Sequence, residues 1–277
     1  MAGDLRFVPR LRRLWVNLFK GGVESDGGAE SDRVGHYPSL IERVMPEIRP
    51  YSMVPDDAIA FAITQCLDAI AEDLPGDIVE CGTWRGGASF AMLLAQRYHL
   101  GRIVKPVWML DSFDGLPPAD PERDGPTAVS WQKLPPEQNY DNCRATLPEV
   151  QAAVDRFGFR EYEAIVTPGW FAQTLPRIEP ELRERSISLL RIDCDWYEPV
   201  LHVLTQLGPL VSNGAVIILD DYFSWRGCAR ATHEFLAAAA APYRIHSLRT
   251  LHNAYLFKYG DLISSGSVPR RAYPPDY

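Results

Sequence analysis

The chain of 277 residues lacks any apolar run as long as the roughly 18 to 20 residues that a membrane-spanning helix requires. Its N-terminus also lacks the apolar core and small-residue cleavage site of a secretory signal peptide. The five cysteines are scattered, odd in number and form no Cys-x-x-Cys pair, which argues against a zinc site or a disulfide framework. These absences predict a cytoplasmic protein with reduced thiols and no stable membrane insertion.

Basic residues are in the minority, with 28 Lys and Arg against 36 Asp and Glu and a formal net charge of −8. A general nucleic-acid binder is therefore not expected. Residues 1–20 are the exception, with five basic residues and one acid. Apolar residues recur there at helical spacing, at Leu11, Leu14, Trp15 and Leu18.

This basic segment has two interpretations. It is either a helix that binds a membrane surface or a partner, or an arm that packs on its own domain or on a second subunit. The second interpretation is favoured. The Gly- and Ser-rich stretch 21–31 predicts a flexible linker, so 1–36 form a basic arm and linker ahead of one domain, 37–277.

From about residue 55 onward, short apolar segments alternate with segments of helical periodicity. Helices are expected at 55–74, 86–98, 136–158 (with a break or kink at Pro148), 198–211 and about 228–241. Strands are expected at 76–82, 107–113, 162–169, 187–195, 214–222, 243–248 and 253–259. This order predicts a parallel sheet covered by helices on both faces, with the last two strands forming a terminal antiparallel hairpin.

Four of these strands end in acidic residues. They are Glu80, Asp111, the pair Asp193 and Asp195, and the pair Asp220 and Asp221. In an open α/β sheet, ligands gather at the carboxyl ends of the strands. One acid at a strand end is commonplace, but four such strands direct carboxylates to one rim of the sheet.

The loop after the first strand, "VECGTWRGG", does not contain the Gly-x-Gly-x-x-Gly of a dinucleotide site. Its single glycine after the strand permits a tight turn and close approach to a ligand. An acid at the end of that strand suits a ligand with an ammonium group or hydroxyls, and Asp111, about 30 residues on, suits the two hydroxyls of a ribose. Together they favour a nucleoside with a positively charged tail, and S-adenosylmethionine is such a ligand.

The aspartates at 193, 195, 220 and 221 predict a metal site. Asp193 and Asp195 share a face if their strand stays extended, and Asp220 and Asp221 end the strand expected beside it. Four crowded carboxylates repel one another, whereas a hard cation such as Mg²⁺ relieves that repulsion and prefers oxygen ligands. Three would suffice as ligands, which leaves one as a base. The alternative is a set of solvated acids, with Asp220 or Asp221 capping the next helix.

Five blocks of the sequence, taken together, are similar to one known family. They are "GDIVECGTWRGGASFAML", "VWMLDSFDGLP", "PGWFAQTLP", "LLRIDCDWYEPVLHVLTQLGPLVSNGAVIILDDY" and "CARATHEF". In order and spacing they resemble the macrocin O-methyltransferase (TylF-type) family over about residues 45–260. The resemblance implies Mg²⁺- and S-adenosylmethionine-dependent O-methylation, in many members of a sugar hydroxyl on a bacterial natural product. It also implies a Rossmann-like class I methyltransferase fold with a seven-stranded, mostly parallel sheet and a terminal antiparallel strand.

Carried over to matching positions, the resemblance implies a set of cofactor-binding residues. Asp111 would hold the ribose hydroxyls, with Ser112 and Phe113 beside the adenine, and "YSMVPDD" would place Met53 over the cofactor. The full set is Met53, Glu80, Gly82, Thr83, Arg85, Gly86, Ala88, Ser89, Asp111, Ser112, Phe113, Gly169, Trp170, Phe171 and Asp193.

The same resemblance implies that Asp193, Asp220 and Asp221 bind the metal and that Asp195 is the general base. Two departures from the family pattern stand out. Cys194 replaces the glycine that usually separates the two aspartates, and the stretch 114–140 matches poorly. That stretch is the expected acceptor lid, so the acceptor, a sugar diol or another diol such as a catechol, is left open.

Histidines and two rival functions complete the sequence-based hypotheses. His202 is expected to be a packing residue, whereas His233 or His252 could assist catalysis at the acceptor.

A nicotinamide-dependent sugar oxidoreductase is disfavoured because neither Gly-x-Gly-x-x-Gly nor Tyr-x-x-x-Lys occurs. A non-catalytic nucleoside-binding homologue is disfavoured because all four aspartates are present. The resemblance suggests a homo-oligomer, a dimer or tetramer, acting on a small-molecule acceptor.

Overall fold

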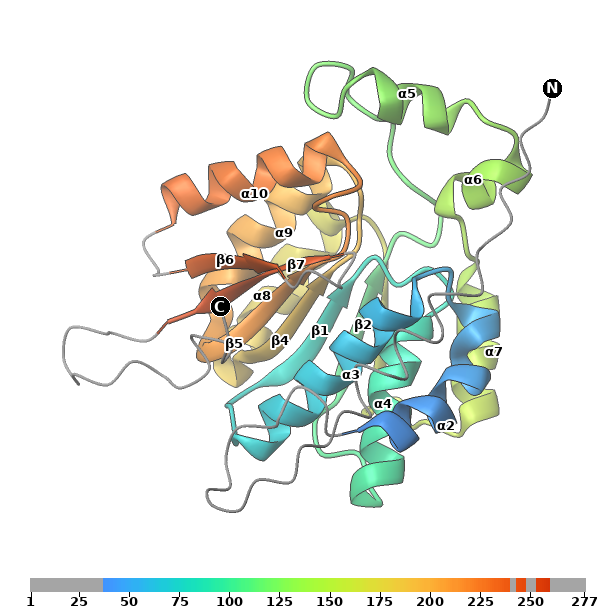
Figure 1. The fold of residues 1–277 in the computed structure, drawn as a ribbon, viewed down its shortest axis with the longest axis vertical. Helices are drawn as coiled ribbons and strands as arrows, with labels where there is room; N and C mark the ends of the chain where they lie inside the picture. Colours follow the sequence, from blue (N-terminus) through green and yellow to red (C-terminus); the bar gives the residue numbers. More distant parts are fainter. Residues whose placement is uncertain (1–36, 240–242, 248–252, 260–277) are drawn as a thin grey trace, which may run out of the picture.

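A twisted sheet with helices on both faces forms the body of the computed structural model (Figure 1). The structure describes residues 37–239, 243–247 and 253–259. The basic arm and linker predicted for 1–36 lie outside the described residues, as does His252. None of the described helices is long and apolar enough to cross a membrane.

Seven strands form the sheet in the order β3-β2-β1-β4-β5-β7-β6. They are β1 (Asp77–Cys81), β2 (Val107–Asp111), β3 (Ala164–Pro168), β4 (Ile187–Ile192), β5 (Val211–Leu219), β6 (Tyr243–Ser247) and β7 (Ala254–Lys258). Strands β1 to β5 pair in parallel, and β7 pairs antiparallel with both β5 and β6. The predicted parallel sheet with a terminal antiparallel hairpin is confirmed.

Alternating side chains of the strands pack against two helical layers, because successive residues of a strand point to opposite faces. Ile78 packs with one layer and Val79 with the other. The first layer contains α2 (Pro38–Ile48), the 3-10 turn Arg49–Tyr51, α3 (Asp56–Ala71), α4 (Gly87–Leu100) and α7 (Leu147–Phe157). The second contains α8 (Phe171–Arg185), α9 (Tyr197–Leu207), the 3-10 turn Gly208–Leu210 and α10 (Arg226–Ala238). Both layers are visible in Figure 1.

Several helices differ from the sequence-based prediction, and α2 and α5 (Pro126–Gln132) were not expected. No helix was expected between β3 and β4, yet α8 lies there and contains Pro176 and Pro180. The break expected at Pro148 falls instead at 144–146. Pro148 itself occupies the first turn of α7, where a proline costs no hydrogen bond, behind a capping box formed by Thr146 and Glu149.

The stretch 114–140, called the lid segment below, stands apart from the two helical layers and carries α5 (Pro126–Gln132) and most of α6 (Pro136–Cys143) (Figure 1). Gln132 holds it together. Its amide nitrogen donates to the Pro117 carbonyl at 2.8 Å and to Asn142 Oδ1 at 2.9 Å, and its Oε1 accepts from Ala119 N at 2.7 Å. The lid segment is therefore a small folded unit with its own hydrogen-bond network.

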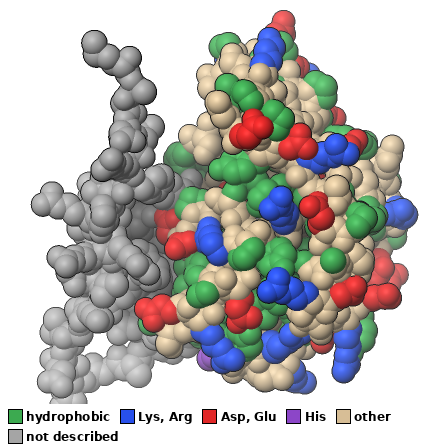
Figure 2. Space-filling view, turned by 90° about the vertical axis from the view of Figure 1, so that its right-hand side faces the viewer, with side chains coloured by type: hydrophobic (Ala, Val, Ile, Leu, Met, Phe, Trp, Pro, Cys, Tyr) green, Lys and Arg blue, Asp and Glu red, His purple; other side chains and the backbone are tan. Residues whose placement is uncertain are grey.

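On the face shown in Figure 2, Lys and Arg side chains are interspersed with Asp and Glu, and apolar side chains lie between them. No large field of one sign covers that face. Its pattern is that of an ordinary charged protein surface.

Candidate active site

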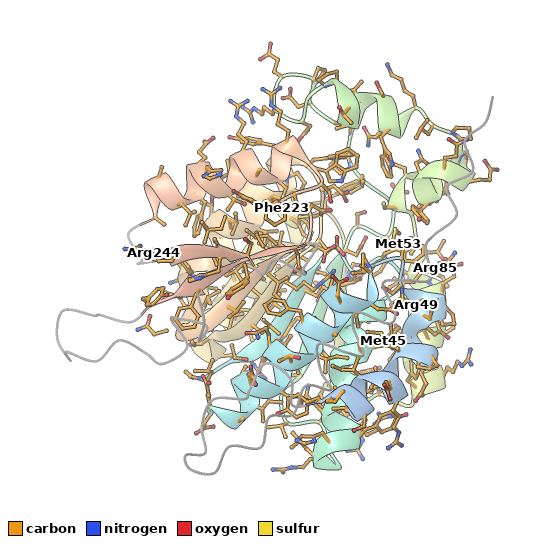
Figure 3. All side chains as sticks on the ribbon, in the orientation of Figure 1. Met45, Arg49, Met53, Arg85, Phe223 and Arg244 are labelled. Carbon is orange, nitrogen blue, oxygen red and sulfur yellow. The ribbon has the colours of Figure 1, made fainter. Side chains whose placement is uncertain are left out.

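A cavity of about 280 Å³ lies where the carboxyl ends of β1, β2, β4 and β5 meet. Its walls come from the loops after these strands, from residues 51–55 before α3, from the start of α8 and from residues 115–117 of the lid segment. Figure 3 shows Met53 and Arg85 on one side of the strand ends and Phe223 on the other. The strand ends that the sequence singled out thus surround one space.

Glycine allows the loop after β1 to pack directly on the loop after β4. Gly82 has φ +86°, and a Cβ there would lie 1.7 Å from the Asp193 carbonyl oxygen. At Gly87 a Cβ would lie 2.4 Å from Ser52 Cβ, so the start of α4 approaches the segment that carries Met53. These close contacts bring the predicted cofactor segments to the same cavity.

Asp111 lines the cavity and also organises the loop after β1. Its Oδ2 accepts from the backbone N–H groups of Thr83 and Trp84, each at 2.8 Å, and its Oδ1 accepts from Phe113 N at 2.8 Å. Burial raises the pKa of this carboxyl, and the three backbone donors oppose that rise. These three backbone N–H groups take up most of the acceptor capacity of the carboxylate.

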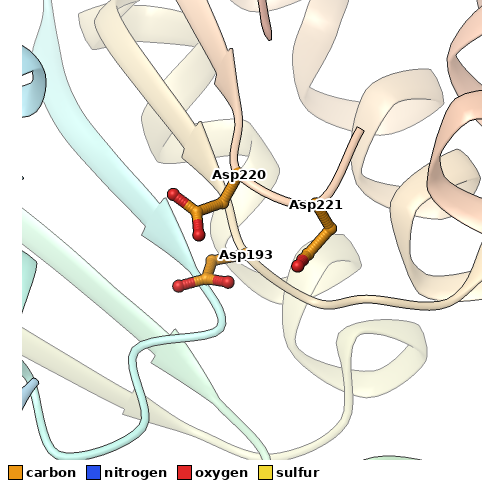
Figure 4. Close-up of side chains that lie close together, drawn as sticks. All are labelled: Asp193, Asp220 and Asp221. Carbon is orange, nitrogen blue, oxygen red and sulfur yellow. The ribbon is translucent and has the colours of Figure 1, made fainter. Parts of the chain in front are cut away.

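Asp193, Asp220 and Asp221 each offer a carboxylate oxygen, and these oxygens lie within 4.8 Å of one another (Figure 4). Burial raises the pKa of Asp193 well above its usual value, and the neighbouring Asp220 raises it further. Burial and the Asp195 charge do the same to Asp221. A further cation next to these oxygens would stabilise the charged form of the cluster.

Asp195 reaches the cluster by a different route from the predicted one. The expectation that Asp193 and Asp195 share the face of an extended strand is wrong, because β4 ends at Ile192 and Asp195 has φ +56°. Its backbone N–H donates to Asp221 Oδ2 at 3.0 Å, and the neighbouring Trp225 side chain lowers the pKa of its carboxyl. Burial raises the pKa of Asp195 to about 7, a suitable value for a general base near neutral pH.

Arg191 lines the cavity as well, although the sequence analysis assigned it no role. Its side chain is 1% exposed, and one of its nitrogens donates to Glu80 Oε1 at 2.6 Å and to Asp193 Oδ2 at 2.8 Å. The other terminal nitrogen donates to Asp220 Oδ1 at 2.6 Å. Burial lowers the pKa of the guanidinium, but the three carboxylates outweigh that effect and raise it overall. Arg191 is thus a permanent cation beneath the aspartate cluster.

The Arg191 contacts leave other oxygens free to face the cavity. Arg191 occupies Asp193 Oδ2 and Asp220 Oδ1, so the second oxygen of each carboxylate remains available beside Asp221. Glu80 is 1% exposed and also accepts a hydrogen bond from the Ser89 hydroxyl. Glu80 is therefore bound mainly to the protein, although it forms part of the cavity wall.

The structure brings ten of the fifteen predicted cofactor-binding residues to the cavity wall: Met53, Glu80, Gly82, Thr83, Ala88, Asp111, Ser112, Trp170, Phe171 and Asp193. The other five, Arg85, Gly86, Ser89, Phe113 and Gly169, are not among its lining residues. Arg85 is exposed and stacks on Trp84. All four aspartates at 193, 195, 220 and 221 line the cavity.

Other lining residues carry no predicted role. Cys143, Ala172 and Pro199 belong to this group. His202, expected to be a packing residue, also lines the cavity, and its Nε2 is buried without a hydrogen-bond partner among the described residues. His233 does not line it, and its Nε2 pairs with the Tyr222 hydroxyl at 2.9 Å.

The model of the family described as Macrocin-O-methyltransferase (TylF) matches residues 43–250, more than half of the chain. The chain belongs to the macrocin-O-methyltransferase family. The similarity seen in the five sequence blocks is thereby confirmed, and the match includes the lid segment as well as the aspartates.

Three curated relatives of this family member are themselves named O-methyltransferases. The Streptomyces olivaceus "8-demethyl-8-(2,3-dimethoxy-alpha-L-rhamnosyl)-tetracenomycin-C 4'-O-methyltransferase" is 34% identical over 171 residues, 61% of this chain and 62% of its own length. "Demethyldecarbamoylnovobiocin O-methyltransferase" of Streptomyces niveus is 35% identical over 63% of this chain and 64% of its length. "Mycinamicin III 3''-O-methyltransferase" of Micromonospora griseorubida is 32% identical over 62% and 65%. The matched segments thus span less than two thirds of these relatives.

Two solved structures share the fold of this macrocin-O-methyltransferase family member. The O-methyltransferase NovP superposes with a TM-score of 0.66 at 24% identity and covers 83% of this chain and 100% of its own. The calicheamicin methyltransferase CalS11 gives 0.54 at 21% identity, over 86% and 100%. The predicted Rossmann-like class I methyltransferase fold is confirmed.

Proposed function

We propose that this protein is an S-adenosylmethionine- and Mg²⁺-dependent O-methyltransferase that methylates one hydroxyl of a vicinal diol on the sugar of a natural product. The observation that carries the proposal is the meeting of Asp193, Asp220 and Asp221 beside Asp195 on one cavity wall. The names of the three curated relatives support O-methylation of glycosylated natural products. A non-sugar diol remains the second candidate acceptor, because two vicinal oxygens of either kind suit the same cluster.

The donor set fits a hard divalent cation. Three carboxylates supply only oxygen, the ligand type that Mg²⁺ prefers, and they offer oxygens within 4.8 Å of one another. Asp193, Asp220 and Asp221 would hold the ion, which when bound supplies Lewis-acid polarisation of the acceptor hydroxyl. Arg191 balances part of the negative charge and fixes two of the three carboxylates.

The chain's own residues would then act as follows. Asp195 accepts the hydroxyl proton as the acceptor oxygen forms its bond to the sulfonium methyl group and the carbon–sulfur bond breaks. The orientation of Asp195 is set by its N–H bond to Asp221 and by the Trp225 side chain. The loops after β1 and β2 hold the nucleoside, so positioning supplies much of the rate acceleration.

A thermal-shift titration tests the class of ligand. S-Adenosylhomocysteine at about 100 times its dissociation constant should stabilise the fold by roughly 2.7 kcal/mol, which raises the Tm by several degrees. NAD at the same concentration should give no shift, because the dinucleotide glycine pattern is absent. Equal shifts with both ligands, or none with S-adenosylhomocysteine at millimolar concentration, would contradict the proposed cofactor.

The aspartate cluster should make stability depend on pH and on metal together. The pKa of Asp195 is about 7 and those of Asp193 and Asp221 are raised, whereas aspartates of an unfolded chain have a pKa of about 4. Between about pH 4 and about pH 7 the folded state therefore binds more protons than the unfolded state. The free energy of unfolding of the metal-free protein should fall as the pH rises through this window. Mg²⁺ replaces those protons, so its stabilising effect should grow with pH.

Denaturation in chelator and in Mg²⁺, at one pH below and one above the Asp195 pKa, measures both effects. The Asp221→Asn variant removes one metal ligand and one titrating carboxyl, so it should show a smaller Mg²⁺ effect and a flatter pH dependence. If Mg²⁺ stabilises wild type and Asp221→Asn equally, the ion binds elsewhere.

A further inference from the structure

The lid segment contacts the loop after β4 and the loop after β5 through a cluster of three tryptophans. Trp131 of α5 packs edge-to-face on Trp196, which precedes α9, with ring centroids 6.0 Å apart, and on Trp225, which precedes α10, at 5.6 Å. Trp196 and Trp225 pack on each other at 4.9 Å. One lid side chain thus bridges the two loops that carry the catalytic aspartates.

Asp124 provides a second connection from the lid segment. Its side chain is buried, its Oδ1 accepts from Tyr197 N at 2.6 Å and its Oδ2 accepts from Asp120 N at 2.8 Å. The N-cap residue of α9, Trp196, makes no side-chain cap, so a lid carboxylate caps this helix instead. A Cβ at Gly227 would lie 1.9 Å from Asp124 Oδ1, so the carboxylate is also pressed against the first turn of α10.

The contacts of Trp131 and of Asp124 both involve residues that neighbour Asp195. The Trp225 side chain lies beside Asp195 and favours its ionised carboxylate, and the Trp196 indole donates to the Pro117 carbonyl of the lid segment at 3.1 Å. Asp195 has φ +56°, a conformation that a residue with a side chain keeps only where its surroundings impose it. The lid segment supplies part of those surroundings.

We propose that Trp131 and Asp124 are positioning residues that hold Asp195 in its left-handed conformation from the lid segment. Trp131 packs on the Trp225 indole beside Asp195, and Asp124 accepts from the backbone N–H of Tyr197, two residues beyond Asp195. The lid that would contact the acceptor therefore also sets the orientation of the base. This inference rests on the proposed role of Asp195.

Hydrogen–deuterium exchange of the full chain with S-adenosylhomocysteine, read by mass spectrometry, tests the connection without an acceptor. Trp131→Ala should speed exchange in peptides covering 193–198 and 221–227 as well as in the lid segment, because Trp225 loses its packing partner. Trp131→Phe keeps an aromatic ring and should restore protection. Lys133→Ala changes an exposed side chain at the C-terminal end of α5 and should leave exchange in both loops unchanged.

A second variant distinguishes an effect on the loop of Asp195 from simple unfolding of the lid segment. Asp124→Ala leaves the tryptophans in place and should speed exchange at the start of α9 in particular, since Tyr197 N loses its acceptor. Faster exchange confined to 114–143 in both variants would overturn the proposal, because the lid would then be loosened without any effect on the base.

Turnover supplies the functional readout. Trp131→Ala should lower kcat by about 100-fold with little change in S-adenosylmethionine affinity, the size expected when a reacting group is misplaced by about 1 Å. Trp131→Phe should recover most of that loss. An unchanged kcat in Trp131→Ala would overturn the positioning role. Absence of methyl transfer by the wild type would instead count against the proposed function, and the exchange data would still decide whether the lid holds these loops.

Discussion

Asp195→Asn should abolish methyl transfer while leaving the structure and the affinity for S-adenosylhomocysteine nearly intact. The substitution preserves side-chain volume, and asparagine tolerates the left-handed conformation at φ +56°. The backbone N–H still donates to Asp221. The substitution removes the negative charge and with it the ability to take a proton, and removal of a general base typically costs 10²- to 10⁴-fold, so we expect roughly that loss in kcat.

The measurement is a comparison of kcat with S-adenosylhomocysteine affinity in the same preparation. Asp155→Asn, at an exposed position of α7, is the matched control and should match wild type in both. Loss of S-adenosylhomocysteine affinity in Asp195→Asn would move Asp195 from proton transfer to cofactor binding. Retention of kcat within a few-fold of wild type would assign the base to another group.

The sheet was predictable because its strands are short apolar segments separated by turn and helix signals. The missed helix, α8, shows the limit of such reasoning. Pro176 and Pro180 argue against a helix interior, since each removes a backbone donor. Its buried positions Leu175, Ile178 and Leu182 nevertheless recur at helical spacing, and this periodicity was the signal that could have revealed it.

The aspartate cluster was predicted as a group because parallel strands end at the same edge of the sheet. The conformation of Asp195 was not predictable, because neither the last residue of β4 nor a left-handed aspartate has a sequence signal. A continuous apolar run does not show where its strand ends. The turn depends instead on tertiary contacts with Asp221 and Trp225.

The lid segment was recognisable only as a departure from the family pattern. Its two short helices, its Gln132 network and its contacts through Trp131 and Asp124 depend on residues far apart in the sequence. Such contacts follow from the fold and cannot be inferred from local periodicity. The acceptor is accordingly the part of the function that the sequence left most open.

Arg191 was missed for a related reason: a single arginine in an apolar strand carries no local sign of its partners. The strand register shows its place, because Arg191 pairs with Glu80 on β1 and with Ile218 on β5. Its guanidinium therefore lies between Glu80, Asp193 and the Asp220 that follows β5. Hydrogen bonding of metal-ligating carboxylates by such residues typically affects metal affinity 10- to 100-fold.

Arg191→Met should therefore weaken Mg²⁺ binding by about 10- to 100-fold and lower the free energy of unfolding at alkaline pH by about 3–5 kcal/mol. Methionine fills much of the volume but leaves Glu80, Asp193 and Asp220 without their cation. The pKa of Glu80 and Asp193 is already raised by burial, and loss of Arg191 would raise it further, so the folded variant takes up protons. Its destabilisation should consequently shrink as the pH falls.

The double variant Arg191→Met/Glu80→Gln separates charge balance from orientation. It removes one buried positive and one buried negative charge together, so stability should return toward that of the wild type. Metal affinity should remain weak, because Asp193 and Asp220 still lack the donor that fixes their outer oxygens toward Asp221. Calorimetric titration with Mg²⁺ and urea denaturation measure the two quantities independently. Loss of a positive charge beside the cluster by itself favours cation binding, so an Mg²⁺ affinity in Arg191→Met equal to or above that of the wild type would show that Arg191 does not orient the ligands.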